Sequence, residues 1–138
     1  MYDYVRNRPV EKIDPVGLVL KNIMYDPKVL KCLSKIVRCA KDSFLQNAVY
    51  QISDIFLDTD FNPDFPSGWT FWPFYGFGKP QIGINSKAWD NFDDMCLTLT
   101  HELIHVTQGF WGSHGENAET EASEKAAEEY WENIRCCK

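Results

Sequence analysis

The amino-acid sequence predicts one domain of the α+β class, built from three long helices and a small antiparallel or mixed sheet. Two observations predict this class. Apolar residues recur at helical spacing in three long segments, and two short runs near the middle of the chain have the length and residue types of strands. A chain of 138 residues, 44% of them hydrophobic, is long enough for one compact core and short for two ordinary domains.

The first half of the chain predicts one clear helix. Asp26 can cap it, Pro27 suits its first position, and apolar residues recur behind them at helical spacing to about Asp42. Residues 48–57 are apolar without a clean period, so helix and strand both remain open for them. Residues 58–68 hold two prolines among acids and amides, which predicts a loop.

Two short strands are predicted next. Residues 69–75 are mostly aromatic, which favours a strand. Pro73 among them favours a place at the edge of the sheet, because proline cannot donate a hydrogen bond to a neighbouring strand. Residues 81–85, after a glycine-rich turn, predict the second strand.

Two helices follow in the last third of the chain. Asp90 can cap the first, which runs to about Gln108, and a last helix spans roughly residues 116–135 after a turn over residues 109–115. One face of the first helix is apolar and is expected to anchor it to the core, whereas the opposite face is polar and suits a cleft. The apolar face carries Met95, Leu99, Leu103 and Val106, and the polar face carries Asp94, Thr98 and Gln108.

The charge balance argues against several kinds of partner. The formal net charge is -6 and the pI is about 5.0, so no positive stripe is expected and nucleic acid is not a predicted partner. No apolar run approaches the length of a transmembrane helix, so no membrane insertion is expected. The first residues, Met1 to Tyr4, lack the basic and then apolar pattern of a secretory signal, so export would need another carrier.

The chain has five cysteines, an odd number whose spacing matches neither a zinc ribbon nor a dense disulfide framework. We interpret Cys32, Cys39 and Cys96 as packing residues on helix faces. The adjacent Cys136 and Cys137 can pair with one of the others in an oxidising compartment, and the sequence leaves that choice open.

A metal-binding motif, His101-Glu102-x-x-His105, lies on the helix that Asp90 is expected to cap. Two histidines four residues apart lie about 40° apart around a helix, so both imidazoles can reach one metal ion. Zinc held by three protein ligands keeps a fourth position for water and lowers the pKa of that water, and a nearby carboxylate must take the proton. The pattern predicts zinc on His101 and His105 with Glu102 as the general base. The alternative is two ordinary histidines that have this spacing by chance.

The third ligand must come from farther along the chain. The metzincin arrangement is absent, because Gln108 and Trp111 stand where it has glycine and histidine. Among the acids of the last helix, Glu119 falls on the small and apolar side that packs inward, and a buried carboxylate is costly unless it is paired or bound to metal. Glu119 is therefore the predicted third ligand, and the alternative is a glutamate that only stabilises the helix start. The solvated face comprises Glu121, Glu124, Lys125, Glu128 and Glu132.

The motif and the helix behind it resemble the gluzincin-like metallopeptidases over about residues 90–130. In those families a His-Glu-x-x-His helix precedes a helix with a glutamate ligand, often in Glu-x-x-Ala-Asp, and the matching residues are 119–123. The resemblance implies a zincin-like fold and peptide-bond hydrolysis with zinc, the substrate lying along strand 81–85 or strand 69–75. Ser123 departs from the pattern, because those families usually have an acid there that orients a zinc-bound histidine.

Two further residues are candidates for stabilising an oxyanion. His114, in the turn before the last helix, can polarise the oxyanion or replace Glu119 as a ligand, or it is simply exposed. Tyr130 is the second candidate, and its alternative is a core aromatic residue.

The first eighteen residues differ from the rest of the chain. The run YVRNRPVEKIDPVGL, residues 4–18, resembles the junction of Rhs/YD-repeat proteins, in which Tyr-Val-x-Asn-x-Pro is followed by Asp-Pro-x-Gly-Leu. In that family the junction separates a conserved shell from a variable toxin, and the chain is cut just after the leucine. The resemblance implies that residues 1–18 end the shell core, that residues 19–138 form the toxin domain, and that Asp14 belongs to the cleavage machinery. The alternative is a proline-rich linker.

Together the two resemblances imply a zinc metallopeptidase toxin. It would be a secreted effector delivered into a competing or host cell, often by a type VI secretion apparatus, with the cytoplasm of that cell as its expected location. Its partners would be a protein or peptide substrate, the Rhs shell before release, and a cognate immunity protein. Two other functions stay open: another zinc amide hydrolase, such as a cell-wall amidase, and a zincin-shaped binding module without turnover.

Overall fold

The computed structural model describes residues 12–13, 19–59, 67–73 and 77–137. Within these residues the strands are β2 (Lys12–Ile13), β3 (Val19–Asn22), β4 (Asp54–Asp58), β5 (Gly68–Phe71) and β6 (Gln81–Asn85). They form one sheet in the order β2-β3-β4-β6-β5. The pair β4 and β6 is parallel and the other pairs are antiparallel, so the sheet is mixed.

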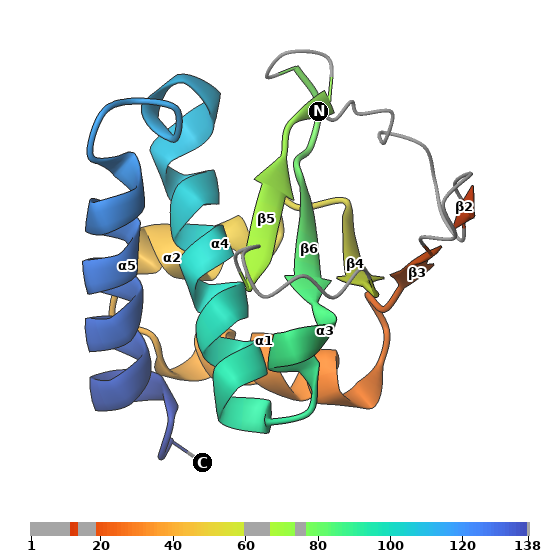
Figure 1. The fold of residues 1–138 in the computed structure, drawn as a ribbon. Coiled ribbons are helices and arrows are strands. Elements are labelled where there is room, and N and C mark those ends of the chain that lie inside the picture. Colours follow the sequence, from red (N-terminus) through yellow and green to blue (C-terminus); the bar gives the residue numbers. More distant parts are fainter. Residues whose placement is uncertain (1–11, 14–18, 60–66, 74–76, 138) are drawn as a thin grey trace.

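The helices lie mainly on one side of this sheet. They are α1 (Pro27–Cys39), α2 (Ser43–Ala48), α3 (Ser86–Trp89), α4 (Phe92–Gly112) and α5 (Ala118–Glu129), which continues into the π-helical turn η2 (Tyr130–Ile134). Figure 1 shows α4 between α5 and the strands β5 and β6. The predicted α+β class and mixed sheet are therefore confirmed. In the described part of the chain, none of the helices is long and apolar enough to cross a membrane.

Capping side chains decide where the two helices of the first half begin. Asp26 caps α1 as predicted, since its carboxylate accepts from the backbone N–H of Lys28 at 2.9 Å. The helix ends at Cys39, earlier than predicted, because Asp42 caps the next helix, α2. In the ambiguous stretch 48–57, residue 48 ends α2, residues 49–53 form a turn and irregular backbone, and residues 54–57 belong to strand β4.

The first predicted strand of the second half is displaced toward the N-terminus. β5 lies at the edge of the sheet, as Pro73 predicts, but it begins at Gly68 and ends at Phe71. The second predicted strand coincides with β6. Two parts of these predictions lie outside the described residues: the middle of the predicted loop, residues 60–66, and the end of the predicted strand, residues 74–75.

Helix α4 starts later than predicted and is broken near its end. The expectation that Asp90 caps it is wrong, because Asp90 directly follows α3 with helical backbone angles. Asn91 is the cap, and its side chain accepts from the N–H of Asp94 at 3.0 Å. Gly109 leaves the helical conformation with φ 77° and ψ 170°, which glycine tolerates because it has no Cβ. This break directly follows Gln108, the predicted end.

The core forms around α4. Its predicted apolar face is buried against the sheet and against α1 and α2. Helix α5 packs beside α4 through small residues, Ala122 and Ala126. The apolar face of α4 comprises Met95, Leu99, Leu103 and Val106, each at most 3% exposed. Because this face is fixed in the core, the opposite, polar face of the helix has a fixed orientation.

Two disulfides join α1 to other parts of the helical layer. Cys32 is bonded to Cys96 of α4 and Cys39 to Cys137, whereas Cys136 is free and exposed. The interpretation of Cys32, Cys39 and Cys96 as simple packing residues is therefore wrong. The bonded Cα atoms are 5.5 and 6.1 Å apart across 64 and 98 residues, a proximity that spacing in the sequence does not reveal. Disulfides persist in oxidising compartments, so the fold suits such an environment.

The predicted junction lies mostly outside the described residues. Asp14 and Leu18, to which the Rhs resemblance gives a part in cleavage, belong to the segment 14–18 that is not described. Strand β2 is the described part of the first eighteen residues, and it pairs with β3 at the edge of the sheet. The domain boundary after Leu18 stays a prediction.

Candidate metal centre

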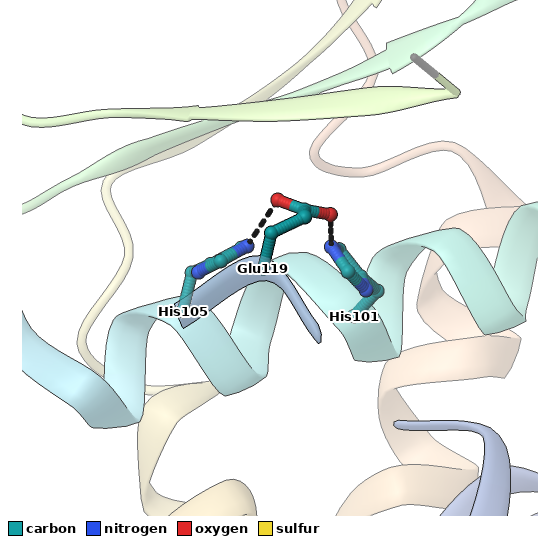
Figure 2. Close-up of side chains that lie close together, drawn as sticks. All are labelled: His101, His105 and Glu119. Carbon is teal, nitrogen blue, oxygen red and sulfur yellow. Dashed lines mark hydrogen bonds and ion pairs between the residues drawn. The ribbon is translucent and has the colours of Figure 1, made fainter. Parts of the chain in front are cut away.

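His101 and His105 lie one turn apart on the polar side of α4. Because the opposite face of the helix is buried, both imidazoles point to the same side, toward Glu119 of α5 (Figure 2). Their ring centroids are 4.9 Å apart, with an angle of 80° between the ring planes. The spacing of four residues thus places two nitrogen donors in one small volume, as predicted.

Glu119, in the first turn of α5, reaches both histidines. Its Oε1 lies 2.7 Å from Nε2 of His101, and its Oε2 lies 3.1 Å from Nε2 of His105 (Figure 2). Donor atoms of the three residues all lie within 4.8 Å of one another. The structure therefore brings the three predicted ligands together from two neighbouring helices.

Glu119 is not the buried acid that the helical wheel predicts. Its side chain is 74% exposed, and Ser123, one turn later, is also exposed. Both side chains border the cleft beside α4, not the core. The inward face is narrower than predicted and comprises Ala118, Ala122, Ala126, Tyr130 and Ile134. Proximity to two histidines, and not burial, is what distinguishes Glu119 from the other acids of this helix.

The donor set fits a zinc ion. Two imidazole nitrogens and one carboxylate are ligand types that zinc accepts, and three protein ligands leave one position open for water. Two ligands of a tetrahedral zinc ion lie about 3.4 Å apart. The measured separations from Glu119 to the histidines are 2.7 and 3.1 Å, so a small outward shift of its carboxylate would accommodate the ion. The group is a candidate metal-binding site.

Gln108 orients the imidazole of His105. Its Oε1 lies 2.8 Å from Nδ1 of His105, and its Nε2 donates to the carbonyl oxygen of Ala118 and the carboxylate of Glu121, both at 3.3 Å. The amide nitrogen of Gln108 faces two acceptors, so its amide oxygen is the atom that faces His105. This oxygen can only accept, so Nδ1 of His105 carries a hydrogen. In the neutral ring, Nε2 is then free to bind a metal ion. Gln108 thus gives His105 the orienting partner that the resemblance expects at Ser123.

Glu102 lies beside the histidines with its side chain buried. It is 5% exposed, its Oε2 lies 3.9 Å from Nε2 of His101, and its Oε1 accepts from the hydroxyl of Thr70 at 2.6 Å. Burial raises the pKa of Glu102 to about 8, an effect that the Thr70 hydrogen bond opposes and the charge of Glu119 reinforces. Burial also lowers the pKa of His101. A bound cation would lower the pKa of Glu102 and favour its ionised form.

A cleft of about 530 Å³ opens over these residues. Strand β5 borders it with Gly68, Trp69 and Thr70, and α5 borders it with Glu119 and Ser123. The histidines and Glu102 line it from α4. Its volume is that of a site for a small molecule or for part of a peptide.

The two oxyanion candidates lie in different surroundings. His114 is exposed and lines the cleft, and its Nδ1 lies 2.6 Å from the carbonyl oxygen of Phe110. A carbonyl oxygen can only accept, so this nitrogen carries a hydrogen. Tyr130 is fully buried, donates its hydroxyl to Asp93 and does not line the cleft. Tyr130 is therefore a core aromatic residue, the alternative that the sequence left open for it, whereas His114 lies at the cleft.

Three contributors to the site have weak signals in the sequence. Gln108 is the easiest to recognise, because it lies three residues after His105 and therefore on the same helix face. Thr70 is 32 residues away from Glu102 in the chain, on a strand whose pairing and depth are not visible locally. Gly68 has the same difficulty, since its close approach to α4 exists only after the sheet has packed.

Comparison of the chain with protein-family models, with curated protein sequences and with solved structures gave no match. These comparisons therefore add no support to the two resemblances. The fold and the site define the class by themselves: an α+β domain with a candidate His-His-Glu metal-binding group on two neighbouring helices.

Proposed function

We propose that this chain is a zinc-dependent hydrolase, and specifically a zincin-like metallopeptidase. The observation that carries the proposal is the position of Glu102, a buried carboxylate whose Oε2 lies 3.9 Å from Nε2 of His101, at the edge of the three-donor group. Hydrolysis needs such a carboxylate, because the attacking water must lose a proton. Three donors that open to a cleft also match catalytic zinc sites better than structural ones, which use four protein ligands.

Each residue of the site has one role in this proposal. When bound, zinc would supply a Lewis acid that activates water near neutral pH. His101, His105 and Glu119 would hold the ion. Glu102 would take a proton from the attacking water at Oε2 and return it to the leaving amine. His114, in its protonated form, would donate from Nε2 to the negative charge that develops on the carbonyl oxygen.

A peptide is the proposed substrate. The likeness to gluzincin-like metallopeptidases supports this choice, as does the strand that borders the cleft. β5 is the last strand on its side of the described sheet, so an extended peptide can pair with its outer edge beside the candidate metal centre.

We also propose that the chain is the toxin portion of an Rhs/YD-repeat protein, on the resemblance of residues 4–18 to the junction of that family. Residues 19–138 would act after release from the shell and delivery into another cell, and an immunity protein would protect the producer. The two disulfides favour an oxidising target compartment over the cytoplasm. The proposal therefore places the action in the envelope of the target cell.

The disulfides also favour a second candidate, an amidase that cuts cell-wall peptides. That substrate lies in the envelope, where disulfides are stable. The same three metal ligands and Glu102 would serve this reaction, because it also breaks an amide bond.

The test uses the purified, oxidised chain loaded with zinc and its Glu102→Gln variant. Each is incubated with envelope proteins of bacteria and, separately, with isolated peptidoglycan, and mass spectrometry detects newly formed amines. We expect cleavage by the wild type and a loss of about 10³-fold in the variant. Both proteins should hold about one zinc ion per chain, because Glu102 is not a ligand.

The outcomes separate the candidate functions. Cleavage confined to envelope proteins supports the peptidase, and cleavage confined to peptidoglycan supports the amidase. Equal cleavage by the wild type and Glu102→Gln contradicts both hydrolases. Zinc binding without any cleavage also contradicts them and favours a binding module, and a wild type that binds no zinc overturns the metal site itself.

A further inference from the structure

Strand β5 lies against α4 beside Glu102. The hydroxyl of Thr70 is 2.6 Å from Oε1 of Glu102 and 3.3 Å from its backbone carbonyl oxygen. A hydroxyl has one hydrogen, and the shorter distance favours donation to Oε1. Thr70 therefore holds one of the two carboxylate oxygens.

Gly68, two residues earlier, allows the strand to lie this close to the helix. A Cβ on Gly68 would lie 2.7 Å from Cγ2 of Thr98, 2.9 Å from the carbonyl oxygen of Gly83 and 3.2 Å from Cγ of Glu102. These distances are shorter than ordinary contacts between carbon or oxygen atoms. Any larger residue would displace the strand or Glu102, so Gly68 and Thr70 serve the same contact.

The second carboxylate oxygen of Glu102 faces the histidines. Its Oε2 lies 3.9 Å from Nε2 of His101, while Oε1 is held by Thr70. The last torsion of a glutamate side chain has a broad, roughly two-fold preference, so it does not by itself fix the plane of the carboxylate. Because Glu102 is 5% exposed, water has little access to replace Thr70 as a partner.

We propose that Thr70 is a positioning residue, whose hydroxyl holds Oε1 of Glu102 so that Oε2 points to the attacking water. This inference rests on the proposed function, in which Glu102 is the base. In this role Thr70 acts through Glu102 and not on the metal ligands. Its removal is therefore expected to reduce turnover without releasing zinc.

Three variants of the full, oxidised chain test this role. Thr70→Val keeps the shape of the side chain and removes the hydroxyl, whereas Thr70→Ser keeps the hydroxyl. Thr107→Val is the matched control, because Thr107 also donates its hydroxyl, to the carbonyl oxygen of Ile104 at 2.6 Å, and does not line the cleft. Turnover is measured on a fluorogenic peptide that contains a bond cut by the wild type, with zinc content and melting temperature measured in parallel.

Thr70→Val is expected to lower kcat roughly 10- to 100-fold, because a misplaced catalytic group costs this much, with little change in KM or zinc content. Thr70→Ser and Thr107→Val should stay within about threefold of the wild type. This pattern separates positioning from general support of the fold, since loss of a purely structural hydroxyl would lower the melting temperature or the zinc content together with turnover.

Each contrary result has its own meaning. Wild-type kcat in Thr70→Val, with Glu102→Gln inactive, overturns the role of Thr70 and leaves the proposed function standing. Equal losses in Thr70→Val and Thr70→Ser, or a loss of zinc in Thr70→Val, assign Thr70 to the scaffold and also overturn its positioning role. A wild type that cuts no bond overturns the proposed function, and the role of Thr70 with it.

Discussion

The two helices that meet at the candidate metal site are held in different ways. Helix α4 is buried along its apolar face, packs against the sheet and is bonded to α1 through Cys32 and Cys96. Helix α5 presents Glu119 from an exposed first turn. Asn117 precedes that turn in a left-handed conformation, with φ 71°, and its side chain makes no capping hydrogen bond. The histidines thus have a rigid support, and the glutamate has a more exposed one.

This difference indicates how the site can accept an ion. The backbone of α4 sets the positions of His101 and His105, so their separation changes little. The exposed side chain of Glu119 can shift to adjust the third ligand. Gln108 joins the two halves of the site, the α4 half with the histidines and the α5 half with Glu119. It contacts His105 on α4 and both Ala118 and Glu121 on α5. We infer that metal affinity depends most on α4 and that closure of the site depends on α5.

The largest expected effect is a loss of zinc affinity, and it tests the two halves of the site directly. His105→Ala removes a buried donor, so zinc affinity should fall about 10³-fold or more, beyond the roughly 10–100-fold that loss of an outer partner costs. Glu119→Gln keeps an oxygen donor and removes the charge, so its loss should be smaller. Competition with a colorimetric zinc chelator measures both affinities. If Glu119→Gln lost as much zinc affinity as His105→Ala, or more, this would contradict the inference that the α4 half is rigid and the α5 half adaptable.

The next effect concerns the anchor of α4. Replacing both Cys32 and Cys96 by alanine is expected to lower the free energy of unfolding by about 2–4 kcal/mol, because the bond closes a long loop in the unfolded chain. Cys136→Ala is the control, since that thiol is free and exposed, and it should change stability by less than about 0.5 kcal/mol. Urea unfolding measures both. Unchanged stability in the double variant would show that packing alone holds α4.

A smaller effect is expected where the two helices are joined. Gln108→Leu removes the acceptor that orients His105 and the contacts to α5, so zinc affinity should fall about tenfold. Gln51→Leu serves as a control, because Gln51 is exposed in a turn between α2 and β4. Titration with zinc in the presence of a competing chelator compares the two variants. Equal affinities would mean that Gln108 does not orient His105.

The smallest effect concerns Asp93, which ties α4 to η2 beyond α5. It accepts from the hydroxyl of Tyr130 and, at 3.2 Å, from Nε of Arg135. The hydrogen bond from Tyr130, opposed by partial burial and helped by Arg135, lowers the pKa of Asp93 below its ordinary value of 3.8. A lowered pKa contributes stability above that ordinary value, and the contribution is lost as the pH falls through the lowered one.

Asp93→Asn should therefore destabilise the chain at pH 7 and less so in acid. The carboxylate is 36% exposed and screened by solvent, so the expected loss is only about 0.5–1 kcal/mol. Urea unfolding of wild type and variant at pH 7 and below pH 3.8 gives the difference at each pH. A difference that stays constant over this range would show that the charge of Asp93 plays no part.

The histidines on α4 could be predicted from the sequence better than Glu119 on α5, because α4 is fixed by local helix geometry and its apolar face, whereas the position of Glu119 depends on tertiary contacts. The pair His101 and His105 follows from helix geometry, and the four apolar residues predicted to anchor α4 are all buried. The sequence predicts a buried Glu119, whereas its side chain is 74% exposed. Its position depends on where α5 starts and how it meets α4, and the left-handed Asn117 that precedes it has no clear signal in the sequence.

Local patterns in the sequence determined the α+β class, the helix that carries the histidines and the orientation of that helix. Helix periodicity and capping act within a few residues, so they can be read without the fold. The tertiary structure alone decided the partners of Cys32 and Cys39, the contact of Thr70 and Gly68 with Glu102, and the exposure of Glu119. These contacts join residues far apart in the chain, and they exist only once the sheet and the helices have packed against one another.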